Sequence, residues 1–321
     1  MSAAHGTALV TGGTGFIGAA LIDRLVAAGV PVVCLVREDG PRRARLDALP
    51  GVRTVRPAAW SAAGLERALA GAAFDAVYHL AASGVSPDAR EPEGLIAGNV
   101  GLTCSLLAAL AAAPPRRFIH VGSCSEYAPI DAPARLREDH PLDPPSLYGA
   151  AKASAFLCGR LLAARLGVPL VALRLFGVYG PGEAPARLVP HLLAKFAAGE
   201  TPELTGGEQV RDFTFIGDVA DALALAAVAP GVEVGEVYNV CSGAPARVRD
   251  LVEMVARLVG REGADLGLGR RPYRADEPMW IVGDPGRFAA ATGFAPRVPL
   301  AEGLRRMAAQ VDASRPAGGA A

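Results

Sequence analysis

The chain has 321 residues and a mass of 32.9 kDa, enough for a nucleotide-binding domain followed by a smaller lobe. Its 32 basic and 32 acidic residues give a formal net charge of zero, which argues against a nucleic-acid or anionic-membrane partner. The five cysteines are scattered and lack the paired spacing of a zinc site or a disulfide framework. We therefore expect no metal centre and a reducing compartment.

The N-terminus is short and polar, without the charged and apolar regions of a signal peptide. No uninterrupted apolar run reaches the roughly 20 residues that span a bilayer. These features predict a soluble, cytoplasmic protein with no membrane partner.

An apolar run that breaks into glycines begins the organised part of the chain, over residues 8–18. This pattern predicts a strand, a tight turn and a helix, with glycines that let the backbone approach a pyrophosphate. Amides at the start of that helix would face the phosphates. A glycine-rich turn without a ligand is the alternative, but the strand before it and the helix after it favour a dinucleotide site. The residues assigned to that site are Gly12, Thr14, Gly15, Phe16, Ile17 and Gly18.

Strands and helices alternate through the first half of the chain. The further strands are predicted at residues 32–36, 52–55, 76–80, 118–122 and 170–176, and the helices between them at 64–70, 95–113 and 148–166. This alternation predicts a doubly wound parallel sheet of the Rossmann type in an α/β protein.

The pattern loosens after residue 176. Short helices are predicted at residues 190–198, 218–228, 248–259 and 300–311, and short strands at 212–216 and 237–240. We expect residues 1–176 to form the dinucleotide-binding domain, with some later elements returning to it. Residues 177–313 would form mainly a smaller mixed α/β substrate-binding lobe over the carboxyl ends of the sheet. A disordered tail is expected at 314–321.

The residues after the second strand bear on the choice of cofactor. A carboxylate there would bind the adenosine ribose 2′-hydroxyl, whereas an arginine accommodates a 2′-phosphate. The sequence places Val36 and then Arg37 at this point, which favours NADP over NAD. Glu38 and Asp39 follow closely, and Arg37 as a solvated surface residue remains the alternative.

Tyr148 and Lys152 are four residues apart at the start of a predicted helix, so they project from the same face. A phenol with a pKa near ~10 exchanges protons slowly at neutral pH unless a nearby cation stabilises the phenolate. Lys152 would supply that charge and hold the nicotinamide ribose. A chance match to this spacing is the alternative.

A third catalytic candidate is Ser123, at the carboxyl end of the strand predicted at residues 118–122. It would hydrogen-bond the substrate oxygen that Tyr148 protonates or deprotonates. Ser125 is assigned to the substrate site, although a serine that caps a loop is the simpler interpretation of it. Cys124 is not expected to act as a nucleophile, because no motif links a histidine base to it.

These motifs together resemble the extended short-chain dehydrogenase/reductase family, in its NAD-dependent epimerase/dehydratase group. The resemblance extends from the glycine turn through the serine loop and the Tyr148/Lys152 pair, and it spans roughly residues 8–307. Its other motifs are residues 79–82 (HLAA), 99–103 (NVGLT), 174–182 (RLFGVYGPG), 211–213 (RDF) and 218–219 (DV).

The resemblance implies a bound nicotinamide dinucleotide, a Ser/Tyr/Lys catalytic set and a nucleotide-linked sugar as substrate. It adds Leu80, Ala81, Ala82 and Asn99 to the residues around the cofactor, with Asn99 bonding loop backbone. It also implies a homodimer formed by a four-helix bundle of the helices around residues 102–113 and 150–166. Arg211, with Arg271 as a weaker second, is expected to bind the substrate phosphates, unless either is a surface ion-pair partner.

Departures from the family pattern reduce the number of candidate reactions. Sugar 4,6-dehydratases of the family have an Asp-Glu pair after the active-site Ser/Thr, where this chain has Cys124 and Ser125; Glu126 is one position away. Many 4-epimerases have Asn where Gly177 stands, and a carboxylate after the second strand. The sequence therefore predicts NADPH-dependent reduction of a 4-keto, typically 6-deoxy, nucleotide sugar, with Tyr148 as the proton donor.

Three alternatives remain open at this stage. The first is an NAD-dependent nucleotide-sugar 4-epimerase, and the second is a ketoreductase of an aromatic or polyketide substrate, which would not need Arg211. The third is a non-catalytic NADP-binding regulator, which would not need the Tyr148 hydroxyl.

Overall fold

The computed structural model describes residues 6–84, 91–130, 133–274 and 276–314, and the tail expected at 314–321 lies outside this range except for Ser314. Within the described residues, seven parallel strands form the main sheet in the order β3-β2-β1-β4-β5-β6-β9. Its strands are β1 (Ala8–Thr11), β2 (Val32–Leu35), β3 (Val52–Val55), β4 (Ala76–His79), β5 (Arg117–Ser123), β6 (Leu170–Leu175) and β9 (Val237–Val240). This order confirms the predicted doubly wound parallel sheet.

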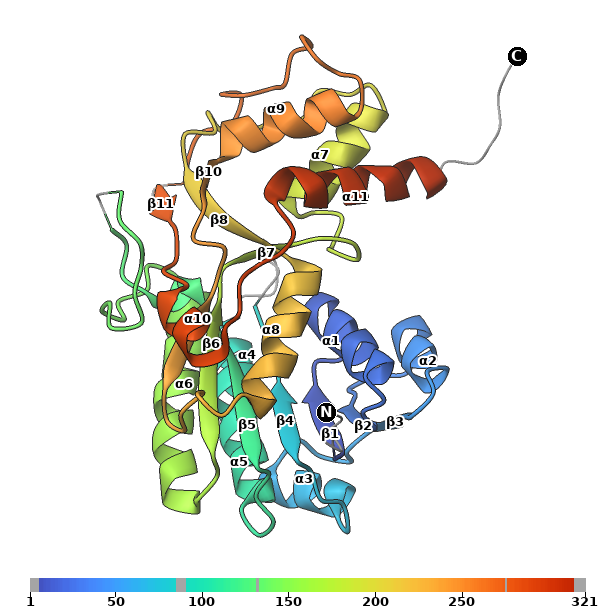
Figure 1. The fold of residues 1–321 in the computed structure, drawn as a ribbon, viewed down its shortest axis with the longest axis vertical. Helices are drawn as coiled ribbons and strands as arrows, with labels where there is room; N and C mark the ends of the chain where they lie inside the picture. The colour runs from blue at the N-terminus through green and yellow to red at the C-terminus, as the bar shows by residue number, and fades with distance from the viewer. Residues whose placement is uncertain (1–5, 85–90, 131–132, 275, 315–321) are drawn as a thin grey trace.

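Helices cover both faces of this sheet (Figure 1). One face packs against α1 (Phe16–Ala27), α2 (Pro41–Asp47), α8 (Ile216–Val228) and α10 (Gly286–Thr292), and the other against α3 (Ala62–Leu69), α5 (Leu102–Leu110) and α6 (Leu147–Leu166). Successive strand residues point to opposite faces, so Leu9 lies in one apolar cluster and Val10 in the other. Because both faces are covered, inner strands such as β1 (ALVT) and β2 (VVCL) are buried throughout, whereas the edge strand β3 (VRTV) is only partly buried.

The smaller lobe is built on a second, mixed sheet in which β8 (Val210–Phe215) is central. Among the described residues it pairs with β7 (Gly177–Tyr179), β10 (Pro245–Arg247) and β11 (Trp280–Ile281). Helices α7 (Leu188–Ala197), α9 (Val248–Leu258) and α11 (Leu300–Ser314) cover it and form an apolar cluster of their own. Figure 1 shows this lobe beyond the carboxyl ends of the main strands.

Two segments of the second half return to the first. Strand β9 completes the main sheet beside β6, and α8 packs on α1 across one face of that sheet. Residues such as Val219 and Leu223 of α8 are fully buried in the same cluster as Val10. The boundary at residue 176 therefore separates elements along the sequence, while the two halves share a core.

The helix predicted at residues 95–113 is in fact three consecutive pieces. The short α4 (Pro92–Leu95) leads into a π-helical segment η1 (Ile96–Gly101) and then α5. Side chains explain the change of pitch: the Asn99 amide donates to the Leu95 carbonyl at 2.8 Å, and the Thr103 hydroxyl donates to the Asn99 carbonyl at 2.6 Å. Such bonds compete with the regular ladder of the helix.

One helical stretch of the described residues, Pro92–Leu110, is long and apolar enough to cross a membrane by length and composition alone. Its α5 part packs against α3 and α6, and helices in the core of a soluble protein can be equally long and apolar.

Candidate active site

The glycine turn between β1 and α1 has the geometry of a phosphate cradle. Gly12 has a φ of +74°, and a Cβ there would lie 2.7 Å from the Ala81 amide nitrogen. A Cβ on Gly18 would lie 2.2 Å from the Gly12 carbonyl oxygen, so helix and turn can pack this closely only with glycine. The N-cap of α1 is Gly15, without a side-chain cap, which leaves the first amides of the helix available to an anion.

The other residues assigned to the cofactor surround this turn. Leu80, Ala81 and Ala82 follow β4, where the Ala81 amide donates to the Thr11 hydroxyl at 3.2 Å. Phe16 and Ile17 contribute backbone at the start of α1, while their side chains pack against the apolar clusters. Thr14 is partly exposed in the turn.

Asn99 bonds protein backbone. Its amide nitrogen donates to the Ser83 carbonyl at 3.2 Å, and its side-chain oxygen accepts from the Ser83 amide at 3.3 Å. It therefore ties the loop after β4 to the π-helical segment.

Arg37 is exposed just past the end of β2. Its guanidinium lies 5.9 Å from the centroid of the Trp60 ring, within the range of a cation–π contact. Its Nη2 also lies 3.8 Å from the point where a Cβ of Gly98 would be, so the side chain reaches toward the π-helical segment.

The N-terminus of α6 brings Tyr148 to the serine loop. The Ser146 hydroxyl caps the helix by accepting from the Gly149 amide at 3.1 Å. A Cβ on Gly149 would lie 2.1 Å from the Ser125 carbonyl oxygen, so only glycine allows this approach. As a result the Ser123 side chain, at the end of β5, lies close enough to the Tyr148 phenol to lower its pKa.

The electrostatics at Tyr148 differ from the sequence expectation. Burial raises the pKa of Tyr148 to about 12, and Cys124 and Glu126 add to the rise. Ser123 and Arg187 are the groups that lower the pKa of this phenol. The ammonium of Lys152 instead donates to the Val121 carbonyl at 2.5 Å, and burial lowers the pKa of Lys152 itself. The phenol is thus a weaker acid than an unperturbed tyrosine.

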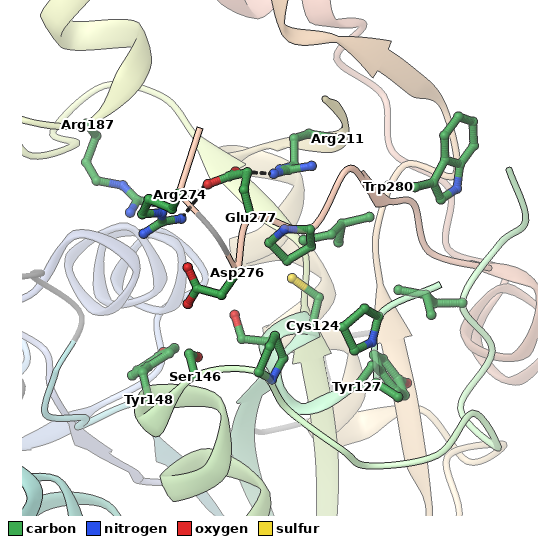
Figure 2. Close-up of a pocket in the computed structure, with 17 residues that line it drawn as sticks. Cys124, Tyr127, Ser146, Tyr148, Arg187, Arg211, Arg274, Asp276, Glu277 and Trp280 are labelled. Atoms are coloured by element: carbon green, nitrogen blue, oxygen red, sulfur yellow. Dashed lines mark hydrogen bonds and ion pairs between the residues drawn. The ribbon is translucent and has the colours of Figure 1, made fainter. Parts of the chain in front are cut away.

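A cavity of about 300 Å³ opens beside Tyr148, between the two lobes (Figure 2). This volume is at the lower end of the range for small-molecule sites. Its charged and polar lining residues include Ser125, Ser146, Arg187, Arg211, Arg274, Asp276 and Glu277, and its apolar wall includes Tyr127, Pro129, Leu136 and Trp280. Because three guanidinium groups face two carboxylates, the lining favours an anionic ligand.

Glu277 holds two of these arginines in place. It accepts from Arg211 Nη2 at 2.6 Å and from Arg274 Nη2 at 2.8 Å, and Figure 2 shows the two guanidinium groups on either side of it. Burial lowers the pKa of Arg211, although the group remains a cation at any physiological pH. Tyr148 and Ser146 lie across the pocket from Arg211.

Arg271 does not join this pocket. Its side chain is exposed, and its backbone amide donates to the Leu204 carbonyl at 2.9 Å. Arg274, from the same basic cluster, lines the pocket instead. Sequence reasoning also missed Arg187, which no motif marked, and the wall residue Trp280.

The remaining candidates have simpler roles. Cys124 lines the pocket, but burial raises its pKa to about 11, which disfavours the reactive thiolate. Gly177 is required by packing, because a Cβ there would lie 2.5 Å from the Asp212 carbonyl oxygen on β8. Within the described residues, no group of three His, Cys, Asp or Glu side chains is placed to hold a metal ion.

Comparison with known proteins places this arrangement in a family. Residues 8–241 match the NAD dependent epimerase/dehydratase family. The chain is similar in structure to a dTDP-glucose 4,6-dehydratase of Streptomyces venezuelae with NAD bound (TM-score 0.85, 30% identity, covering 96% of this chain and 97% of the other).

Curated relatives carry other activities on the same scaffold. The chain is 29% identical over 328 residues to a UDP-glucose 4-epimerase of Azospirillum brasilense, covering 96% of this chain and 92% of the relative. It is 31% identical over 314 residues to a dTDP-6-deoxy-L-talose 4-dehydrogenase (NAD(P)(+)) of Kitasatospora kifunensis, covering 93% of each. On the match over residues 8–241, the chain belongs to the NAD dependent epimerase/dehydratase family.

Proposed function

We propose that the protein reduces the ketone of a 4-keto, typically 6-deoxy, nucleotide sugar with NADPH. The observation that carries this proposal is the Tyr148 phenol, which lies next to the Ser123 loop and lines an arginine-lined pocket. A ketone reduction needs a proton donor at the carbonyl oxygen, and a phenol with a pKa of about 12 is protonated at neutral pH. The similarity to a 4-dehydrogenase of a 6-deoxy nucleotide sugar supports the same chemistry.

The residues present fit a nicotinamide dinucleotide. The cradle at Gly12 and Gly18 has no room for a Cβ, and the uncapped start of α1 points amides at the phosphate position. When bound, the reduced dinucleotide supplies the hydride. Arg37 is exposed just past the end of β2, and a guanidinium at this point would neutralise an adenosine 2′-phosphate, which supports NADPH over NADH.

Each catalytic side chain then has one task. Tyr148 donates the proton to the substrate oxygen, and Ser123 holds that oxygen through its hydroxyl. Lys152 lies one helical turn along α6, where its ammonium donates to the Val121 carbonyl. When the dinucleotide binds, this ammonium would exchange that bond for one to the nicotinamide ribose.

Arg211 and Arg274 are proposed to bind the substrate diphosphate. Both reach the pocket from the smaller lobe, and Glu277 keeps their guanidinium groups apart and oriented. A guanidinium fork matches the geometry of phosphate oxygens, and for Arg211, whose side chain is 18% exposed, burial strengthens the attraction.

Two observations speak against 4,6-dehydration. The positions where the family's dehydratases have a carboxylate pair carry Cys124 and Ser125, and the Cys124 thiol is a poor acid or base because burial raises its pKa to about 11. Glu126, one position further, is fully buried in an ion pair with Arg174 and does not line the pocket. Neither position offers a base for the proton at the carbon next to the ketone.

The test is incubation with NADPH and a panel of 4-keto-6-deoxy nucleotide sugars. We expect NADPH absorbance to fall in proportion to the product formed. Consumption of an aromatic or polyketide ketone in preference to every nucleotide sugar would replace the substrate class and leave the catalytic set intact.

An NAD-dependent nucleotide-sugar 4-epimerase is the second candidate. It is supported by the likeness to UDP-glucose 4-epimerase over nearly the whole chain. Net cofactor balance separates the two: an epimerase interconverts unmodified UDP-hexoses with no net change in NADH or NADPH. Such turnover, without consumption of NADPH on any 4-keto sugar, would establish the epimerase.

We also propose a homodimer through α5 and α6, in a reducing cytoplasm. On α6, Leu157 and Leu161 are 44% and 62% exposed one turn apart, as expected of a face covered by a second copy. A Leu157→Glu/Leu161→Glu variant should elute as a monomer with light-scattering detection. Leu258→Glu, at an exposed leucine of α9, is the matched control and should leave the mass unchanged. A wild-type monomer would reject this interface.

A further inference from the structure

Glu126 lies directly behind the catalytic serine and is 0% exposed. Its Oε1 accepts from the Ser123 amide at 2.7 Å, while the Ser123 hydroxyl accepts from the Ser125 amide at 3.1 Å. The two residues thus form a reciprocal capping box around the short 3₁₀ turn η2 (Cys124–Glu126). The position of the Ser123 backbone is therefore fixed by a carboxylate.

Arg174 of β6 completes the arrangement. Its Nε donates to Glu126 Oε2 at 2.8 Å, and the two side chains are only 2% and 1% exposed. The guanidinium carbon lies 4.6 Å from the Tyr127 ring centroid and 5.0 Å from that of Phe156, on α6. The ion pair therefore joins the end of β5 to the helix that carries Tyr148.

The chain makes specific room for this carboxylate. Gly122 pairs with Arg174 between β5 and β6, and a Cβ on Gly122 would lie 2.4 Å from Glu126 Oε1. A fully buried ion pair is not needed for stability as such, because apolar side chains of similar volume stabilise as well or better. A role at the active site accounts for keeping both charges.

We infer that Glu126 is a positioning residue, which holds the Ser123 backbone beside Tyr148 and places a buried negative charge behind the phenol. The electrostatics point the same way: after burial and Cys124, Glu126 is the group that raises the pKa of Tyr148, and it also raises the pKa of Lys152 against the effect of burial. This inference rests on the proposed function in one respect only, namely that Tyr148 donates the proton rather than accepting it.

Other charged and titratable groups surround the two residues. Around the phenol they are Cys124, Arg187, Arg211, Arg274, Asp276 and Glu277 of the pocket and Lys152 of its own helix, and around Glu126 they are Arg174, Tyr127, Lys152 and Cys124. Glu126 is a buried carboxylate behind the catalytic residues, and removing its charge should lower the pKa of Tyr148.

The test compares the wild type with Glu126→Gln, which keeps the shape and an acceptor for the Ser123 amide but removes the charge. Reduction needs the protonated phenol, so kcat falls as pH rises through the pKa of Tyr148. Without the negative charge this pKa is lower, and we expect the falling limb to move to lower pH by about one unit. The substrate KM should stay within about twofold.

A second variant separates this effect from folding. Glu126→Gln alone leaves the Arg174 charge buried and unpaired, whereas Glu126→Gln/Arg174→Met removes both charges and packs a thioether between the two rings. We expect the double variant to recover thermal stability and to keep the shifted pH limb. A merely structural role predicts that stability and pH limb both return to wild-type values, and that result would overturn the inference.

A titration of tyrosinate absorbance gives the same information without substrate. The difference between each protein and its Tyr148→Phe counterpart isolates this one phenol. A lower midpoint of the Tyr148 titration in both Glu126 variants supports the inference. If these proteins turn over no sugar, that result rejects the proposed function and leaves the inference standing. An unchanged midpoint in an enzyme that reduces the sugar would reject the inference alone.

Discussion

The dinucleotide turn and the substrate pocket lie at the same edge of the sheet but are built in different ways. The turn consists of neighbouring residues, and its shape is enforced by backbone contacts such as that between Gly18 and Gly12. The pocket gathers side chains from segments far apart in the sequence, including Arg187, Arg211 and Arg274. One added atom can therefore destroy the turn, whereas the pocket should lose its function by degrees.

Tyr148→Phe should have the largest effect, because this residue serves both regions. Removing one hydroxyl takes away the proton donor, and we expect kcat to fall by about 1,000-fold. Binding of NADPH and of the sugar, measured by fluorescence titration, should stay within a few fold. Tyr273→Phe, which removes a hydroxyl bonded to Glu208 away from the pocket, is the matched control. Full activity in Tyr148→Phe would show that another group is the proton donor.

Gly18→Ala should break the turn. The added Cβ would lie 2.2 Å from the Gly12 carbonyl oxygen, and relieving that overlap moves the phosphate-binding amides. We expect NADPH to bind about 100-fold more weakly, equivalent to close to 3 kcal/mol. Gly94→Ala, on α4 where a Cβ meets nothing within 4 Å, should bind normally. Equal affinity in the two variants would contradict the proposed phosphate cradle.

Arg274→Ala should weaken the pocket in part. Loss of one charge-assisted contact to a diphosphate predicts a rise in KM of about 30-fold, or roughly 2 kcal/mol, with kcat little changed. Arg211→Ala should behave similarly. Arg271→Ala should leave KM unchanged, because the Arg271 side chain is exposed outside the pocket. Steady-state kinetics on all three variants would contradict the assignment if Arg271 proved the more sensitive position.

Arg37→Ala should have the smallest effect, on cofactor choice alone. Loss of the guanidinium removes the partner of a 2′-phosphate, so the preference for NADPH over NADH should fall by about tenfold. The measurement is the ratio of kcat/KM for the two cofactors. An unchanged ratio would mean that Arg37 only stacks on Trp60 and that NAD is the natural cofactor.

Sequence reasoning succeeded where structure is local. Continuous apolar runs predicted the strands of the main sheet to within two residues, and the spacing of the glycines predicted the turn. The π-helical segment was missed because its cause, the bond of Asn99 to Leu95, is a choice between side-chain and backbone partners that periodicity does not show.

The pocket could be predicted only in part. Arg211 was found because a motif marks it, but that Arg274 rather than Arg271 lines the pocket and pairs with Glu277 is a tertiary contact that no motif marks. The electrostatics at Tyr148 were also beyond the sequence: spacing suggested that Lys152 lowers the phenol pKa, whereas burial and Glu126 raise it. Burial is a property of the whole fold, and no local pattern reports it.

The most direct test of the account follows the hydride. NADPH carrying deuterium at the transferable C-4 position is incubated with a 4-keto-6-deoxy nucleotide sugar, and the product is analysed by mass spectrometry and NMR. We predict one deuterium at the sugar C-4 for each NADPH oxidised, and none with Tyr148→Phe on the same timescale. A product without deuterium, formed with no loss of NADPH, would contradict the proposed reduction.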